Sequence, residues 1–167
     1  MEKVGEKNKT VKSAIIILVA LVLLFAGMIM LANKGAKNAN LAKEDQKHAI
    51  INIAGKHLVA SVADSKASRT KGLSSVHSIG PNEGKLFVFD EEGYHEFWMK
   101  DMNFSLDIIW INDLGTVVEI QENVSPESYP NSFKPMAPAS KTLEVNAGYV
   151  AQNGIKIGDQ MIWTELK

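Results

Sequence analysis

An uninterrupted apolar segment lies near the start of the chain. Residues 14–32 carry no charged side chain and consist almost entirely of Ile, Leu, Val, Ala, Met and Phe. As an α-helix this segment would be about 28 Å long at ~1.5 Å per residue, which is close to the ~30 Å hydrocarbon core of a bilayer. Because a helix satisfies its own backbone hydrogen bonds, it is stable in lipid. The pattern therefore predicts a single transmembrane helix over residues 14–32.

A cleaved signal peptide and a buried core helix are the two alternatives to this anchor. A signal peptide has a shorter apolar region and a small-x-small cleavage site, whereas residues 31–34 offer no clean site. Lysine is more frequent in residues 1–13 than just after the segment, and the positive-inside rule places the lysine-rich flank in the cytoplasm. We therefore predict a single-pass cell-membrane protein with residues 1–13 in the cytoplasm and an extracytoplasmic C-terminal domain.

The segment after the predicted span is polar. Residues 33–48 are rich in Asn, Ala, Lys and Gly and have no strong apolar face, which predicts a linker between membrane and domain. A juxtamembrane helix is the alternative for this segment. From residue 49 onward the pattern changes to short apolar runs, so residues 49–167 are predicted to form one soluble domain.

Short apolar runs separated by turn residues dominate this domain. They predict strands near residues 51–53, 58–62, 86–89, 97–99, 106–111, 117–120, 143–145 and 161–166. The run at 106–111 is almost continuously apolar, which favours a strand buried on both faces. The proline-rich stretch 125–138 is expected to be irregular.

Only two helices are expected in the domain, and both are short. One follows the capping residues Asp64 and Ser65 and ends at Gly72. The other covers residues 147–153 and is closed by Gly154. Many short strands with only two short helices predict a mainly β fold, either a sandwich or a barrel.

Composition excludes several classes of function. The formal net charge is −1, so no basic excess indicates a nucleic-acid partner. The chain has no cysteine, which excludes a disulfide framework, a thiolate zinc site and a cysteine nucleophile. No His-Glu-x-x-His, Gly-x-Ser-x-Gly or phosphate-loop motif is present, and we expect no cofactor and no metal.

The candidate chemistry is concentrated in residues 94–107. If this stretch begins as a strand, alternate residues share a face. One face then carries His95, Phe97, Met99 and Asp101, and the other carries Glu96, Trp98 and Lys100. Lys100 and Asp107 lie in apolar surroundings, where a charge needs a partner or a shifted pKa. The two interpretations are a polar pocket around Lys100 and Asp107, or a structural role as an ion pair or a turn cap.

Two further interpretations involve single side chains of this stretch. His95, Met99 and Met102 are ligand types that suit copper outside the cytoplasm, although Met more often fills cores. Trp98 could stack against a sugar or another small ligand, or could be a core residue.

Taken in order, the motifs resemble a family known as domain of unknown function 192, over about residues 53–166. The matching segments are Arg69-Thr70-Lys71-Gly72-Leu73, Gly84-Lys85-Leu86-Phe87-Val88-Phe89, Phe97-Trp98-Met99-Lys100-Asp101-Met102, Leu106-Asp107 and Leu143-Glu144-Val145-Asn146-Ala147-Gly148. Three positions depart from the family pattern: Ser74 and Lys85 each replace a Met, and Ser105 replaces a Pro.

The resemblance implies a jelly-roll-like β-sandwich, often exported or membrane-anchored, and supplies no activity. Arg69, Trp98, Met99, Lys100 and Asp107 fall on its marker positions and are the candidate ligand-binding residues. The leading hypothesis is a membrane-anchored, extracytoplasmic, non-catalytic module that binds an unknown small ligand or envelope component in a polar pocket around Arg69, Lys100 and Asp107.

Two alternatives to this hypothesis stay open. One is an enzyme acting on a sugar or anionic envelope substrate through Lys100 and Asp107, which requires a lowered lysine pKa. The other is a copper-handling module that uses Met99 and His95.

Overall fold

The computed structural model describes residues 19–35 and 47–166. The chain divides into two compact units, Met1–Asn40 and Leu41–Lys167. In the first unit, residues 19–35 are helical and their large apolar side chains are exposed. No helix among the described residues is long and apolar enough to cross a membrane. The predicted cytoplasmic segment 1–13, the start of the predicted span and most of the predicted linker lie outside the described residues.

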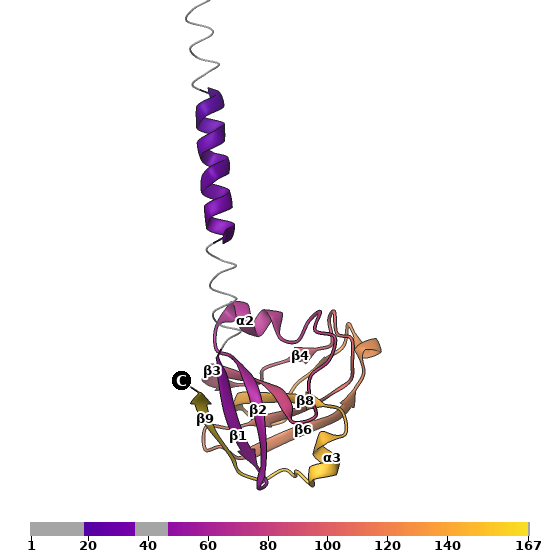
Figure 1. The fold of residues 1–167 in the computed structure, drawn as a ribbon. Coiled ribbons are helices and arrows are strands. Elements are labelled where there is room, and N and C mark those ends of the chain that lie inside the picture. Colours follow the sequence, from indigo (N-terminus) through magenta and orange to yellow (C-terminus); the bar gives the residue numbers. More distant parts are fainter. Residues whose placement is uncertain (1–18, 36–46, 167) are drawn as a thin grey trace, which may run out of the picture. The chain divides into compact units, whose positions relative to one another are not determined.

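The described part of the second unit is mainly β, which confirms the predicted class (Figure 1). Its strands are β1 (His48–Ile53), β2 (Lys56–Ala63), β3 (Glu83–Gly93), β4 (Phe97–Trp98), β5 (Leu106–Ile111), β6 (Val117–Val124), β7 (Ser132–Phe133), β8 (Ala139–Asn146) and β9 (Met161–Leu166). Its helices are α2 (Lys66–Lys71), α3 (Tyr149–Asn153) and the single 3₁₀ turn η1 (Pro126–Ser128). The expected irregular stretch contains only η1 and the two-residue strand β7.

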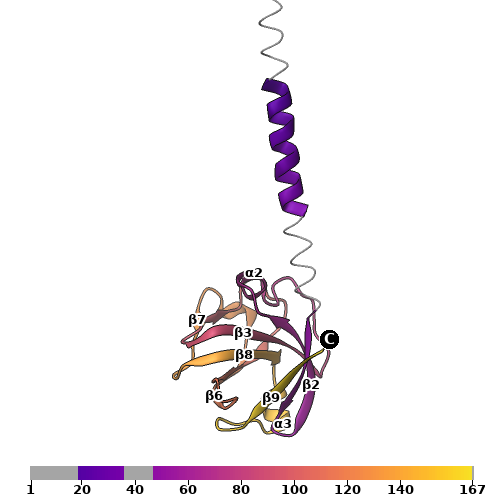
Figure 2. The same ribbon diagram turned by 90° about the vertical axis from the view of Figure 1, so that its left-hand side faces the viewer.

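Seven of these strands form one mixed sheet in the order β6-β5-β8-β3-β2-β1-β9, and β4 pairs with β7 in a small second sheet. The large sheet curls so that its outermost strands approach each other (Figure 2). An antiparallel bridge joins Thr116 to Gln160, and the backbone N–H of Val117 donates to the carbonyl of Asp159 at 2.9 Å. The strands therefore wrap around a common interior, as in a barrel.

This arrangement differs from the jelly-roll-like sandwich that the family resemblance implies. A jelly roll is built from two facing antiparallel sheets. Here the connection from β2 to β3 passes through α2, and the two strands pair in parallel. Parallel neighbours need such a crossover connection, so the large sheet is mixed and single.

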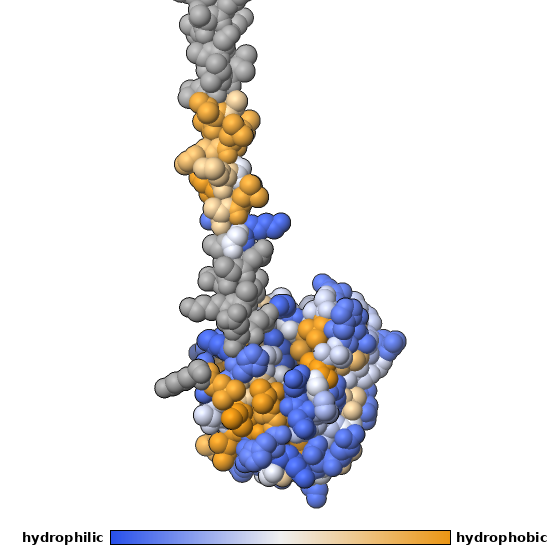
Figure 3. All heavy atoms as spheres, in the orientation of Figure 1, coloured by the Kyte–Doolittle hydropathy of each residue, from blue (hydrophilic) through white to orange (hydrophobic). Residues whose placement is uncertain are grey.

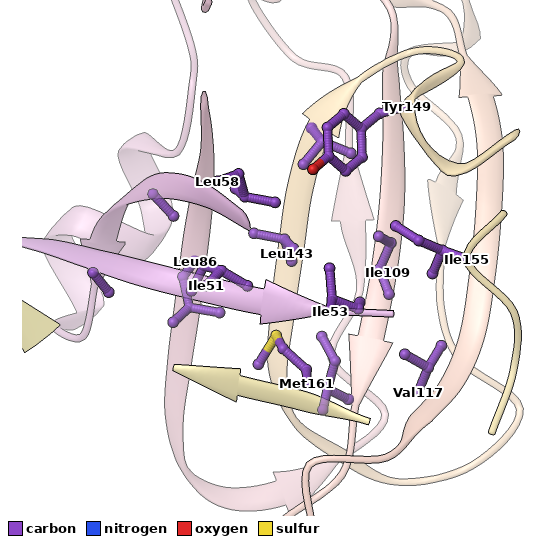
Figure 4. Close-up of a cluster of buried hydrophobic side chains, with 14 of the residues drawn as sticks. Ile51, Ile53, Leu58, Leu86, Ile109, Val117, Leu143, Tyr149, Ile155 and Met161 are labelled. Atoms are coloured by element: carbon purple, nitrogen blue, oxygen red, sulfur yellow. The ribbon is translucent and has the colours of Figure 1, made fainter. Parts of the chain in front are cut away.

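Two apolar clusters cover the two faces of the sheet. The first core lies inside the curled sheet and receives side chains from all seven of its strands, among them Ile51, Leu86 and Leu143 (Figure 4). The second core lies on the opposite face of β3, β5 and β8, under the segment that carries β4. Strand β5 contributes Ile109 to the first core and Trp110 to the second. The predicted burial of this strand on both faces is confirmed, since all six of its residues are buried.

The outer face of β1, β2 and β9 is the exception to this double covering. Ile50, Val59, Ile162 and Leu166 are exposed there, and Ile50 is directly opposite Val59 in the register of β1 and β2. Figure 3 shows apolar side chains gathered on this side of the domain. The central strands, in contrast, have no comparable free face.

Helix α2 forms where its capping signals predict it. The Ser65 hydroxyl accepts a hydrogen bond from the backbone N–H of Ser68, and the Ser68 hydroxyl caps the N–H of Ser65 in return. This capping box satisfies two N–H groups that the first turn leaves free. Gly72 ends the helix at φ +52°, a conformation that favours glycine. Arg69 lies in the last turn of α2, shortly before this helix end.

Candidate functional site

The structure distributes the five candidate residues over four places. Arg69 and Trp98 line the same cavity, which has a volume of about 300 Å³. Met99 is buried in the second core, and Lys100 is exposed. Asp107 is fully buried in β5 and does not line the cavity. The predicted polar pocket around Arg69, Lys100 and Asp107 therefore does not form as one group.

The cavity lies between α2, β3 and the segment that carries β4. Basic residues come from α2, aromatic residues from β3 and β4, and one acidic residue each from β8 and from the start of the β4 segment. Its principal lining residues are Lys66, Arg69, Lys71, Leu73, Phe87, Phe89, Glu96, Phe97, Trp98, Met102 and Glu144. An apolar wall with a few convergent polar groups is the usual composition of a small-molecule site.

Arg69 is held in a fixed position beside the cavity. Its Nη1 donates to the carbonyl oxygens of Asp64 at 2.8 Å and Val88 at 2.7 Å. The guanidinium carbon lies 5.1 Å from the centre of the Phe89 ring, within the range of a cation–π contact. No carboxylate forms an ion pair with Arg69 within the described residues. The side chain is thus oriented while its positive charge is not neutralised by a neighbouring acid.

Glu144 is a buried acidic residue of this cavity that was not among the candidates from the sequence. It lies on β8 directly opposite Lys85 of β3 and is only 5 % exposed. Its Oε2 has no hydrogen-bond partner among the described residues. Burial raises the pKa of Glu144 from an ordinary value of 4.5 to about 8, although the positive charge of Lys85 acts in the opposite direction. At neutral pH the carboxyl group is therefore mainly protonated.

Strand alternation explains why Glu144 was missed. Leu143 and Val145 belong to the first core, so alternation predicts that Glu144 faces solvent on the other side. The second core covers that side as well. The available signal was a pair of charges: Glu144 lies between the apolar Leu143 and Val145, and Lys85 directly precedes the apolar run 86–89. Their cross-strand register cannot be read from the sequence.

The predicted alternation of side chains between two faces is present over residues 96–100, around β4. Phe97 and Met99 are buried, whereas Glu96, Trp98 and Lys100 are exposed. The Trp98 side chain is 55 % exposed, which shows that it is not a core residue.

Aromatic contacts extend from the cavity in two directions. The Trp98 ring meets the Tyr129 ring edge-on with a centroid distance of 6.1 Å. The His95 ring stacks on Phe89 at 3.5 Å and its Nε2 lies 3.1 Å from the carbonyl oxygen of Glu91. Both residues of the copper hypothesis therefore take part in packing: His95 stacks on Phe89, and Met99 belongs to the second core.

Asp107 has a structural role that was one of the two interpretations of its sequence position. Its Oδ1 accepts from the backbone N–H of Asn123 at 2.8 Å and its Oδ2 from that of Val150 at 2.9 Å. Asn123 has a φ of +54°, at a register shift between β5 and β6. Val150 is in the first turn of α3, where N–H groups lack helical partners. One carboxylate thus supports both a β-bulge and a helix start.

Replacing Asp107 by Ala is expected to lower the free energy of unfolding by about 3 kcal/mol. The change leaves two backbone N–H groups without acceptors, each at about 1–3 kcal/mol. Urea denaturation followed by tryptophan fluorescence measures the difference. Asp113→Ala is the control, because Asp113 is exposed and its replacement should change stability by less than about 0.5 kcal/mol. Equal effects of the two substitutions would contradict the structural role.

Glu144→Gln is expected to remove part of the pH dependence of stability. Because the folded-state pKa of Glu144 is raised to about 8, the unfolded state releases its proton first as pH rises. The wild-type free energy of unfolding should therefore fall between about pH 5 and pH 8, with a slope from this group of up to about 1.4 kcal/mol per pH unit.

Urea denaturation at several pH values across this range checks the difference between variant and wild type. Glu122→Gln, at an exposed position of β6, should keep the wild-type profile. An unchanged profile in Glu144→Gln would show that the buried carboxyl is not the source.

Two solved structures resemble the domain in sequence and fold. A Sinorhizobium meliloti 1021 protein, provisionally assigned as a transcription regulator, is 28 % identical with a TM-score of 0.65, covering 70 % of this chain and 92 % of its own. A Novosphingobium aromaticivorans DSM 12444 protein of unknown function is 28 % identical with a TM-score of 0.63, covering 70 % and 84 %. No curated protein matches the chain significantly.

The family model of domain of unknown function 192, described as an uncharacterized ACR, matches residues 49–163. This match covers more than half of the chain and includes every cavity residue. It confirms the resemblance drawn from the ordered sequence motifs. The chain belongs to the domain of unknown function 192 family.

Proposed function

We propose that the protein is a membrane-anchored, extracytoplasmic, non-catalytic binding module that takes a small ligand with an anionic group in the cavity beside Arg69. The observation that carries the proposal is the state of the Arg69 guanidinium. It is oriented by two backbone carbonyls, lines the cavity and has no carboxylate partner within the described residues. A cation in this state is prepared to pair with an anion from outside the protein.

The remaining donors of Arg69 define how the anion would bind. Within the described part of the chain, the hydrogen bonds of this side chain use only Nη1, so Nε and Nη2 remain for a ligand. A planar guanidinium edge matches the two oxygens of a carboxylate or phosphate. Lys66 and Lys71 line the same cavity and add positive potential at its α2 side. Phe87 and Phe89 supply an apolar wall for the body of the ligand.

Binding is favoured over the enzyme hypothesis because the expected catalytic pair is separated. Asp107 is committed to the backbone N–H groups of Asn123 and Val150. Lys100 is exposed and does not line the cavity, and its carbonyl accepts from the Ser74 hydroxyl at 3.0 Å. An acid and a base acting on one substrate must both reach it.

The proposed anchor rests on residues 14–32 and on the lysines that flank them. In the described part of this segment, large side chains such as Leu24 and Met30 are 70 % and 77 % exposed. Lipid is the environment in which an apolar helix of this kind is stable without covering protein. The formal net charge of −1 gives no reason to extend the Sinorhizobium protein's assignment to a nucleic-acid role here.

Arg69→Gln is expected to weaken binding of small organic anions at least tenfold, because the substitution removes the charge that pairs with them. Screening the full chain by thermal shift against small carboxylates, phosphates and sulfonates identifies binders, and titration calorimetry measures their affinities. Lys100→Gln is the matched control, since it removes an exposed charge outside the cavity. If both variants bind like the wild type, the Arg69 cavity is not the binding site.

Protease treatment of intact cells is expected to degrade the C-terminal domain before the membrane is permeabilised. This outcome follows from a cytoplasmic segment 1–13 and an anchor over residues 14–32. A C-terminal epitope tag reports the domain, and a cytoplasmic marker protein reports cell integrity. A domain that survives until detergent is added would overturn the proposed topology.

A further inference from the structure

The buried carboxyl group of Glu144 further restricts which ligands the cavity can bind. Glu144 lines the cavity, is 5 % exposed, and its Oε2 lacks a hydrogen-bond partner among the described residues. A buried polar oxygen without a partner costs about 1–3 kcal/mol, so a native structure normally satisfies it. Because Glu144 lines the cavity, a ligand bound there can supply that hydrogen bond.

The surroundings and the protonation state of Glu144 indicate that the ligand group bonded to it is a neutral hydroxyl. Lys85 faces it across the β3–β8 pair, Arg69, Lys66 and Lys71 border the cavity from α2, and Glu96 borders it from the β4 segment. Burial keeps the pKa of Glu144 near 8, so the group is mainly protonated at neutral pH. A protonated carboxyl both donates and accepts a hydrogen bond, which matches the donor and acceptor character of a hydroxyl.

The volume and the lining residues of the cavity restrict the size and the chemical type of the ligand. A volume of about 300 Å³ is at the lower end of the ~300–1,000 Å³ range of small-molecule sites. It therefore suits a single ring rather than a chain of rings. Phe87, Phe89 and Trp98 contribute aromatic surface, and such surface packs against the apolar C–H groups of a sugar ring.

We propose that the ligand is a hydroxylated carboxylic acid of monosaccharide size, a uronic acid. This inference rests on the proposed function. Its carboxylate pairs with Arg69, one ring hydroxyl bonds the Glu144 carboxyl, and its ring packs on the aromatic wall. This assigns Glu144 as a specificity residue for a site whose anion selectivity comes from Arg69.

The experiment measures binding of three probes to the full chain by titration calorimetry at pH 7. Glucuronate has both the carboxylate and the hydroxyls, glucose has the ring without the carboxylate, and cyclohexanecarboxylate has the carboxylate without the hydroxyls. Glucuronate is expected to bind at least tenfold more tightly than either of the others. This comparison is made on the wild-type protein and does not depend on the folding of any variant.

Two substitutions at Glu144 then separate recognition from packing. Glu144→Met replaces the carboxyl by an apolar side chain of similar size, and should weaken glucuronate binding about tenfold while leaving cyclohexanecarboxylate binding unchanged. Glu144→Gln keeps a donor and an acceptor, and should stay within about threefold of the wild type for glucuronate. Lys100→Gln, outside the cavity, should bind all probes as the wild type does.

The outcomes distinguish this inference from the function on which it rests. If cyclohexanecarboxylate or another organic anion binds through Arg69 as tightly as glucuronate, or if Glu144→Met weakens both acids equally, the uronic-acid assignment is overturned and the anion-binding module stands. If no anion binds in an Arg69-dependent way, both proposals fail.

Discussion

Strands β5, β8 and β3 are neighbouring interior strands of the seven-stranded sheet, and apolar clusters pack on both of their faces. This double covering is the constraint on which the rest of the domain depends. A carboxyl group in the buried part of these strands has little contact with solvent, so it must be bonded by the protein or have its charge suppressed. Asp107 on β5 follows the first course and Glu144 on β8 follows the second.

The elements of the fold were largely predictable because their signals are local. The caps at Ser65 and Gly72 define α2 within a few residues of chain, and the continuous apolarity of residues 106–111 indicates a strand buried on both faces. The curling of the sheet and the parallel pair β2–β3 were not predictable in this way. They depend on where α2 packs and on contacts between residues near 116 and 160, which no local pattern encodes.

The site was predictable only in part, since charge alone does not reveal what a residue can bind. Arg69 and Asp107 both hydrogen-bond the backbone, and both stood out as charges on motif positions. The two carboxylate oxygens of Asp107 each accept from a backbone N–H. Arg69, in contrast, bonds residues of the described ranges through one of its three nitrogens and lines a cavity. The difference between a structural charge and one suited to binding lies in these spatial partners.

Lys85 influences the pKa of the buried Glu144 carboxyl. The family pattern has a Met at this position, and a Met would offer Glu144 no electrostatic attraction. The positive charge of Lys85 lowers the pKa of Glu144, while desolvation raises it more, and the balance lies at about 8. A carboxyl balanced in this way is mainly neutral at pH 7, yet a modest change in its surroundings shifts a measurable fraction of it to the charged form. A ligand hydroxyl that hydrogen-bonds the neutral carboxyl would favour the protonated form further, because a hydrogen bond to the neutral state disfavours the charged one.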